Sequence, residues 1–318
     1  MAGTHAVGYA LKSRNLIVAN DIQYYSEIFG RALISNKSCL NLRSQCAKDF
    51  SDLKPQNFLN SFHRYVDKRV KMIAYAEDCD PIVYDNSQIK IFDHHARLPK
   101  LVKFKDTWKN IPKANGDVTD DPIRSRRKDS GKGFKWHAIR FANKVYAVLD
   151  AARTCNSDIL IWMDADSIVH TKMPLEFYED FIPDDVFLSY AGRKGKYTEC
   201  GWYSMNLRHP YADEFFNEFE RMYNDAENGI FQLDEWHDSF VFDEVRKWHE
   251  KKFSVNNFNY SRGLVNGEGH PIINSRLGGY IDHMKGNRKE TGRSMQSDLT
   301  VRRSEKYWLY NTDYESRK

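Results

Sequence analysis

The sequence lacks several features that would mark a membrane or secreted protein. No run of about 18 apolar residues occurs, so no transmembrane helix is predicted. Residues 1–10 lack the basic start and apolar centre of a signal peptide. The five cysteines are scattered, odd in number and without a Cys-x-x-Cys pair, which argues against a disulfide framework or a structural zinc site. These absences predict a reduced, cytoplasmic setting.

Strong charge imbalance is also missing. The chain carries 48 Lys and Arg against 44 Asp and Glu, a net charge of +4, which permits an anionic ligand without demanding nucleic acid. Neither an internal repeat nor a low-complexity tract is present. With 318 residues, of which 41% are hydrophobic, the chain is long enough for one large α/β domain.

The most informative stretch is an apolar run that ends in two carboxylates. Residues 159–163 read Ile-Leu-Ile-Trp-Met, and Asp164-Ala165-Asp166 follows. Such a run predicts a buried central strand of a mainly parallel sheet, with function at its carboxyl end. An Asp-x-Asp placed there supplies oxygen ligands for Mg²⁺ or Mn²⁺. Without the strand the tripeptide would be weak evidence.

Short apolar strands alternate with longer helical segments, as in a doubly wound sheet. Residues 16–19 predict a first strand that ends at Asn20, and residues 70–76 a second one. Tyr24 follows the first strand, where it could stack on a planar base or pack on a neighbouring loop. A helix predicted over residues 134–153 leads into the Asp-x-Asp strand.

The remaining segments are expected to be peripheral. Residues 97–133 contain three prolines and the basic run 124–128, which predicts a surface loop. This loop could be merely solvated, or it could be a mobile lid or an acceptor-binding loop. Residues 1–14 predict an N-terminal extension, and the polar residues 291–318 a C-terminal tail. The single domain is therefore predicted to span residues 15–290.

Two further segments offer candidate ligand-binding groups. Gly201 opens an irregular strand beside Trp202, where it either lets the backbone approach a ligand or marks a bulge. A helix is predicted to open near residue 233, with Asp234 and Asp238 four residues apart on one face. These acids could complement the helix dipole or meet a polar ligand, and the sequence leaves both readings open.

A histidine, a glycine turn and several cations follow one another near the C-terminus. In His283-Met-Lys-Gly286-Asn-Arg-Lys289, the imidazole could ligate a metal ion and the lysine could neutralise phosphate. Taken alone, this segment could equally be a solvated basic turn.

Together, Asp164-Ala165-Asp166 and His283-x-x-Gly286-x-x-Lys289 resemble the GT-A glycosyltransferases that use nucleotide sugars. Within that group they resemble the metal-dependent retaining branch that includes glycogenin and the lipopolysaccharide galactosyltransferases. The resemblance implies a Rossmann-like, mainly parallel twisted sheet flanked by helices.

The same resemblance assigns roles to individual residues. It makes Asp164, Asp166 and His283 ligands of Mn²⁺ (or Mg²⁺), and Gly286 and Lys289 the grip on the donor phosphate. It also makes Arg140 and Lys144, on the helix before the strand, candidates for donor contacts, although both could be surface cations. Further candidate donor-binding residues are Asn20, Tyr24, Ala165, Gly201 and Trp202.

The resulting hypothesis is sugar transfer from a nucleoside-diphosphate sugar, UDP-linked by preference, to a hydroxyl acceptor such as a glycan. Asp238, and after it Asp234, is the candidate for the residue that steadies the sugar or acts as base, and retention is favoured. Three alternatives remain: glycosylation of a modified nucleic-acid base, a metal-dependent nucleotidyltransferase or phosphohydrolase, and a non-catalytic nucleotide- or glycan-binding module. The sequence does not indicate an oligomeric state.

Overall fold

The computed structural model describes residues 16–21, 54–77, 81, 83, 85–119, 133–264, 270–285, 288 and 292–309. Of residues 16–21, and therefore of Asn20, it describes the backbone alone. Tyr24, Gly286 and Lys289 lie outside the described residues. Within the described part of the chain, none of the helices has the length and apolar character needed to cross a membrane.

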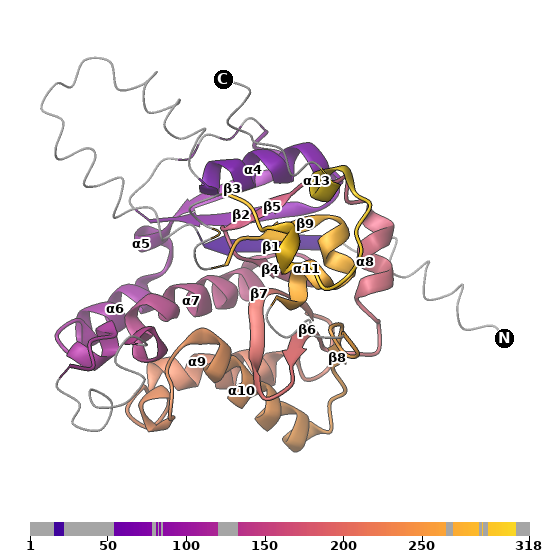
Figure 1. Ribbon diagram of the computed structural model, residues 1–318. Coiled ribbons are helices and arrows are strands. Elements are labelled where there is room, and N and C mark those ends of the chain that lie inside the picture. Colours follow the sequence, from indigo (N-terminus) through magenta and orange to yellow (C-terminus); the bar gives the residue numbers. More distant parts are fainter. Residues whose placement is uncertain are drawn as a thin grey trace, which may run out of the picture.

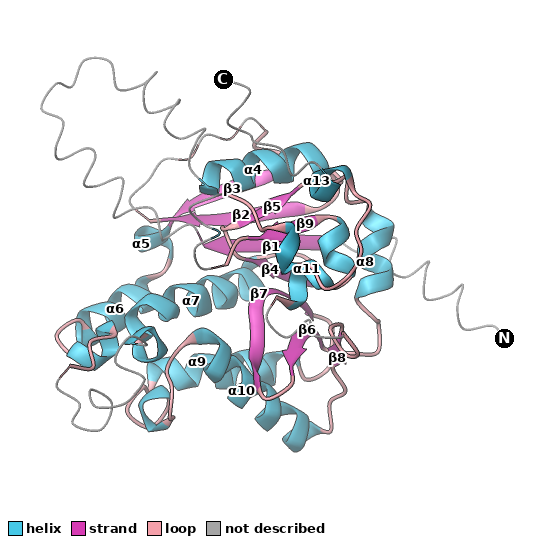
Figure 2. Cartoon of the chain, in the orientation of Figure 1, coloured by secondary structure: helices cyan, strands magenta, loops and turns pink. Residues whose placement is uncertain are grey.

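A seven-stranded sheet in the order β3-β2-β1-β4-β7-β6-β8 forms the centre of the molecule (Figures 1 and 2). The strands β3, β2, β1 and β4 are mutually parallel, whereas β7 is antiparallel to both β4 and β6, and β8 is parallel to β6. A separate pair of antiparallel strands, β5 and β9, lies beside this sheet. The strands are β1 (Leu16–Asp21), β2 (Lys71–Ala76), β3 (Ile89–Asp93), β4 (Ile159–Met163), β5 (Ser167–Val169), β6 (Leu188–Arg193), β7 (Lys196–Asn206), β8 (Phe258–Asn259) and β9 (Ile281–His283).

Helices cover both faces of the sheet (Figure 1). The α-helices are α4 (Lys54–Tyr65), α5 (His94–Arg97), α6 (Pro99–Trp108), α7 (Ala138–Thr154), α8 (Leu175–Phe181), α9 (Ala212–Asn224), α10 (Asp238–Phe253), α11 (Pro271–Asn274) and α13 (Lys306–Leu309). Short 3-10 helices span Pro112–Asn115, Gly133–Trp136, Ile230–Gln232, Arg276–Gly279 and Gln296–Asp298. This mainly parallel sheet between helices confirms the predicted α/β class.

The central strand β4 is apolar throughout because both of its faces are buried. Successive side chains of a strand point to opposite faces. Leu160 and Trp162 therefore enter the core formed with α6, α7, α9 and α10, whereas Ile159, Ile161 and Met163 enter the core formed with α4 and α8. Strand β2 divides its side chains between the same two cores. Burial on both faces fixes the end of β4, and with it the position of the residues that follow.

Residues 97–133 are not the continuous loop that their composition predicted. Helix α6 occupies Pro99–Trp108 within this range, with Leu101 and Phe104 buried three residues apart. Pro99 stands in the first turn, where a proline lacks only a hydrogen bond that the helix does not make there. One of the three prolines that suggested a loop, Pro99, is therefore at the start of a helix.

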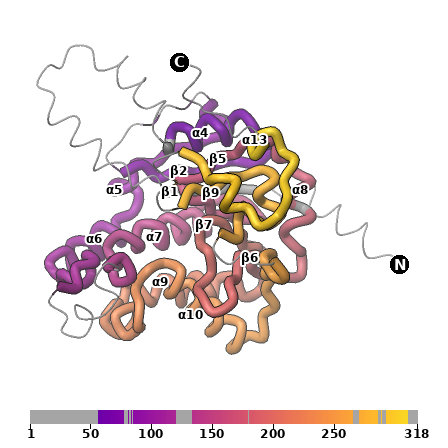
Figure 3. The backbone as a smooth tube through the Cα atoms, viewed as in Figure 1, coloured from indigo at the N-terminus to yellow at the C-terminus, as the bar shows by residue number. Residues whose placement is uncertain are grey.

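The described part of the predicted tail is also an integral part of the fold. Trp308 is 1% exposed, and its Nε1 donates to the carbonyl of Gly278 at 2.7 Å. The hydroxyl of Tyr307 donates to Asp282 at 2.6 Å. Figure 3 shows this C-terminal stretch, in yellow, beside β5. The prediction of a peripheral tail after residue 290 is therefore wrong for residues 292–309. These residues are mostly polar, but they include Trp308, which is buried in the fold.

Candidate active site

The two carboxylates lie in a tight turn at the carboxyl end of β4. The amide of Ser167 donates to the carbonyl of Asp164 at 3.2 Å, which closes the turn. The indole of Trp162 donates to Oδ1 of Asp164 at 2.7 Å and so orients that carboxylate. Both acids are thus fixed by the strand end and by the turn directly after it.

The pairing of β5 with β9 brings His283 to this turn. Ser167, directly after the second acid, lies opposite His283 in the antiparallel pair. The amide of Met284 donates to the carbonyl of Asp166 at 2.9 Å. Nε2 of the imidazole lies 3.1 Å from Oδ1 of Asp166 and 3.7 Å from Oδ2 of Asp164. The sheet contact therefore joins the two motifs that are far apart in the sequence.

Gly201 makes room for this imidazole. Its carbonyl accepts a hydrogen bond from the amide of Asp164 at 3.0 Å, so its backbone lies against the acidic turn. A Cβ atom added at Gly201 would lie 2.5 Å from Cε1 of His283, which is far closer than ordinary contact. The glycine is required here because of the close approach of the imidazole.

The three side chains fit a divalent metal ion. One donor atom from each of Asp164, Asp166 and His283 lies within 4.8 Å of the others. Two carboxylates and one imidazole suit Mn²⁺. Burial opposes protonation of the imidazole, but the carboxylates of Asp166 and Asp164 outweigh it and raise the pKa of His283 to about 10. A metal ion would therefore displace a proton from His283 when it binds.

A cavity of about 770 Å³ opens at this cluster. Its walls come from the β4–β5 turn, the β6–β7 hairpin, α7, the start of α10 and β9. The predicted residues that line it are Arg140, Lys144, Asp164, Ala165, Asp166, Gly201, Asp238 and His283. Its size suits a small molecule such as a nucleotide sugar.

Lys144 links the acidic turn to α10. Its Nζ lies 2.8 Å from Oδ1 of Asp164 and 2.7 Å from Oδ2 of Asp238. Burial opposes the charge of the ammonium group, but the two carboxylates raise the pKa of Lys144 well above its usual value. The lysine is therefore a buried cation at the site and not one of the surface cations that the sequence left open.

Asp238 is the first residue of α10 and faces the same cavity. Burial raises its pKa, but Lys144 and His237 hold the pKa of the Asp238 carboxyl well below its usual range. His237 in turn lies 2.9 Å from Glu235, which also pairs with Lys135 at 2.6 Å. Asp238 is thus a permanently charged carboxylate at neutral pH.

Two predicted residues lie elsewhere. Helix α10 begins at Asp238, so Asp234 precedes the helix, is exposed and is not among the cavity-lining residues. The expectation that the two acids share one helical face is therefore wrong. Trp202 is 1% exposed and packs edge-on against Phe181, away from the cavity lining.

The structure adds charged residues that the sequence analysis did not select. Glu199 lies 3.3 Å from Arg193 and also pairs with Lys285, and all three line the cavity. Glu235, His237 and Lys135 line another part of it. Proximity in the sequence could have indicated two of them. Glu199 lies on β7, two residues before Gly201, and Lys285 lies just beyond β9, two residues after His283.

Comparison with known proteins gives no sequence match. Neither a protein-family model nor a curated protein sequence matches the chain. Among similar solved structures is the WbbM bifunctional glycosyltransferase, with 11% identity and a TM-score of 0.37 over 73% of this chain and 37% of that one. The apo-form glycosyltransferase GlyE of Streptococcus pneumoniae TIGR4 shares 10% identity, with a TM-score of 0.36 over 77% of this chain and 44% of that one.

A third similar structure is a glycosyltransferase involved in glycosylation of the major capsid of PBCV-1, with 9% identity and a TM-score of 0.37. That match covers 87% of this chain and 98% of the other. The chain spans less than half the length of WbbM and of GlyE. At these TM-scores the likenesses establish neither a family nor an activity.

Proposed function

We propose that this protein is a metal-dependent glycosyltransferase that moves a sugar from a nucleoside-diphosphate sugar to an acceptor hydroxyl. The proposal rests on one observation: donor atoms of Asp164, Asp166 and His283 lie within 4.8 Å of one another, and all three residues line one cavity. The same cavity contains a further charged carboxylate, Asp238, at a separate position.

The residues around the cavity supply the parts that this reaction requires. A Mn²⁺ ion held by Asp164, Asp166 and His283 would neutralise the charge that develops on the departing diphosphate. The phosphates are proposed to contact Lys285, and also Gly286 and Lys289 of the His-x-x-Gly-x-x-Lys motif. Lys285 reaches the cavity from just beyond β9.

The charge state of Asp238 bears on the stereochemistry. A catalytic base works best when its pKa lies near the working pH. The pKa of Asp238 is held well below the usual range of a carboxyl group by Lys144 and His237, so Asp238 is a weak base. A fixed negative charge instead steadies positive charge on the sugar ring. This role agrees with the retaining course that the motif resemblance implies. The UDP-sugar donor and the glycan acceptor are proposed from that resemblance alone.

The proposal is tested by screening UDP- and GDP-sugars with the purified full chain and an oligosaccharide acceptor, in Mn²⁺ and in EDTA. We expect Mn²⁺-dependent release of one nucleoside diphosphate. Asp164→Asn and His283→Ala should each reduce the rate by at least about 100-fold, the size of effect expected when charge stabilisation in the transition state is lost. Asp180→Asn is the matched control, because that carboxylate is exposed and is not part of the cavity lining.

The outcomes separate the alternatives. Full activity of Asp164→Asn in added Mn²⁺ would refute the metal-ligand assignment, provided that circular dichroism shows an intact fold. Release of phosphate or pyrophosphate would indicate a phosphohydrolase or a nucleotidyltransferase. Binding of a nucleotide sugar without turnover would indicate a binding module. A salt-dependent gel shift with duplex DNA would favour a nucleic-acid acceptor.

A further inference from the structure

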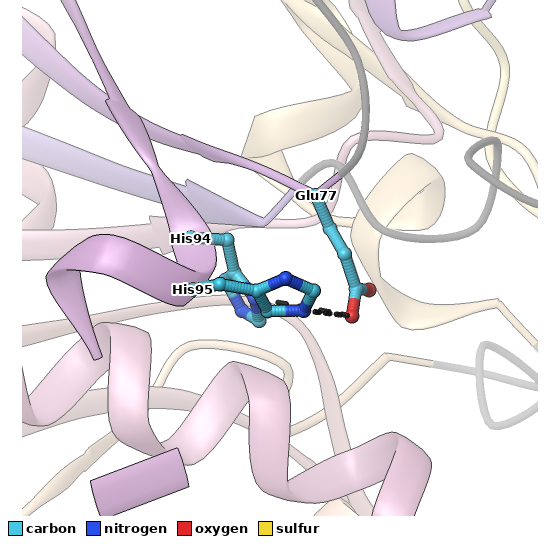
Figure 4. Close-up of side chains that lie close together, drawn as sticks. All are labelled: Glu77, His94 and His95. Carbon is cyan, nitrogen blue, oxygen red and sulfur yellow. Dashed lines mark hydrogen bonds and ion pairs between the residues drawn. The ribbon is translucent and has the colours of Figure 1, made fainter. Parts of the chain in front are cut away.

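A second cluster of metal-ligating side chains lies at the carboxyl ends of β2 and β3, away from the cavity lining. These strands are parallel, and Ala76 at the end of one pairs with Asp93 at the end of the other. Glu77 follows the first strand, and His94 and His95 follow the second. Figure 4 shows the three side chains pointing toward one another.

The spacing of their donor atoms approaches that of a metal site. Nε2 of His95 lies 3.2 Å from Oε1 of Glu77, and Nδ1 of His94 lies 4.0 Å from the same oxygen. One donor atom from each of the three residues lies within 4.8 Å of the others. Zinc–nitrogen bonds of about 2.0–2.1 Å in a tetrahedral shell put neighbouring donors roughly 3.4 Å apart. Small side-chain rotations would therefore suffice to complete the site.

His94 provides independent support. Its side chain is completely buried, yet neither ring nitrogen has a hydrogen-bond partner among the described residues. An imidazole buried without partners is unfavourable, so it needs an explanation. Burial also lowers the pKa of His94 to about 4, which keeps the ring neutral and its lone pair available at pH 7.

The backbone holds the histidines in place before any ion binds. Asp93 caps α5, since its Oδ1 accepts a hydrogen bond from the amide of Ala96 at 2.6 Å. The two histidines are the first residues of that helix. Their positions are therefore set by the strand end and by the cap, as a preorganised ligand pair requires.

We propose that Glu77, His94 and His95 form a second metal site, which binds a divalent transition-metal ion of the Zn²⁺ class. Two imidazoles and one carboxylate favour Zn²⁺ or Co²⁺ over Mg²⁺, and they leave one position of a tetrahedral shell open. The site differs from the Asp164 cluster in donor set and in place, since β1 separates β2 from β4 in the sheet. It does not depend on the proposed glycosyl transfer.

Lys105 is expected to lower the metal affinity of this site. Its Nζ lies 2.5 Å from Oε1 of Glu77, where it supplies the positive charge that a metal ion would otherwise bring. An incoming cation must compete with this ammonium group. Removal of the lysine charge is therefore expected to tighten metal binding, an effect that a purely structural cluster would not show.

The test uses the full chain carrying Asp164→Asn and Asp166→Asn, which removes two metal ligands of the Asp164 cluster and so weakens metal binding there. Zn²⁺ is titrated by calorimetry, and Co²⁺ by the visible absorption of a tetrahedral complex. We expect one ion per chain. His95→Gln and Glu77→Gln should each weaken affinity at least about tenfold, and Lys105→Met should strengthen it.

The His95→Gln variant is expected to fold, because the His95 side chain is 46% exposed, and circular dichroism checks the fold of Glu77→Gln. His63→Gln is the matched control, since His63 is also partly exposed and lies 3.9 Å from a carboxylate of Asp85. The His63→Gln variant should bind Zn²⁺ with the same affinity as the parent chain that carries Asp164→Asn and Asp166→Asn. Absence of binding at millimolar Zn²⁺, or equal affinity in the parent, His95→Gln and Glu77→Gln, would overturn the proposal.

Discussion

Gly201→Ala isolates the contact that positions the imidazole of the Asp164 cluster. The new Cβ would lie 2.5 Å from Cε1 of His283 and 2.8 Å from each ring nitrogen, whereas ordinary contact begins at 3.4 Å. The imidazole or the β7 backbone must therefore retreat by about 0.9 Å, the difference between 3.4 and 2.5 Å. The substitution changes neither a charge nor a metal ligand.

The expected effects follow from that displacement. Metal–ligand distances in proteins lie within about ±0.2 Å of their usual values, so a shift of this size in the imidazole would remove His283 from the coordination sphere. Affinity for Mn²⁺ should fall at least about tenfold, which corresponds to about 1.4 kcal/mol. Overpacking of this kind lowers the free energy of unfolding by about 1–3 kcal/mol.

The assay combines Mn²⁺ calorimetry with urea denaturation. Gly279→Ala is the matched control, because a Cβ there would meet the carboxylate end of Glu305 at 3.0 Å, a side chain that can turn aside. This control should retain the parental Mn²⁺ affinity.

A double-mutant cycle then tests the steric cause. In a His283→Ala background the clashing ring is absent, so Gly201→Ala should no longer reduce stability. An equal loss of stability in both backgrounds would refute the steric argument. Unchanged Mn²⁺ affinity in Gly201→Ala would refute the expected displacement of the His283 imidazole.

Two further predictions concern buried titratable groups. Lys144→Met removes the ammonium group that pairs with the carboxylates of both Asp164 and Asp238 and should lower the free energy of unfolding by about 3–5 kcal/mol, with part of the loss recovered in saturating Mn²⁺, as measured by urea denaturation. Burial lowers the pKa of His170 to about 4, so its contribution to stability is complete above pH 6.5 and is lost as pH falls toward 4, by up to about 3 kcal/mol. His170→Phe keeps the ring that stacks on Tyr307 and should flatten this pH dependence in denaturation curves from pH 7 to 4, whereas an unchanged slope would contradict the assignment.

The sequence indicated the centre of the fold because local pattern and tertiary position agree there. The apolar run of β4 is buried on both faces, and such strands read as continuous hydrophobic segments. The polar residues after it therefore mark the strand end reliably. The helix before this strand was also predicted correctly, because its apolar residues recur at helical spacing on the side that is buried. Helix α7 spans Ala138–Thr154, close to the predicted 134–153.

Elsewhere the local pattern was ambiguous. Strand β3 is only five residues long and is interrupted by Lys90, so it offers no continuous apolar run and was not predicted. Without it, nothing in the sequence connects Glu77 with His94, because their proximity arises from the pairing of two parallel strands. The start of α10 was misplaced for a related reason, since the acids before Asp238 resemble a helix N-terminus although the helix begins later.

The position of His283 depends on contacts that no local pattern reveals. Neighbouring side chains of a strand point to opposite faces, so Asp282 points away from the acidic turn that His283 approaches. Asp282 accepts hydrogen bonds from the amide of Ser294 at 2.7 Å and from the hydroxyl of Tyr307 at 2.6 Å. Residues 292–309 therefore hold β9 from one face while β5 pairs along its edge. The segment that composition placed outside the domain is thus part of the structure that brings the histidine to the two carboxylates.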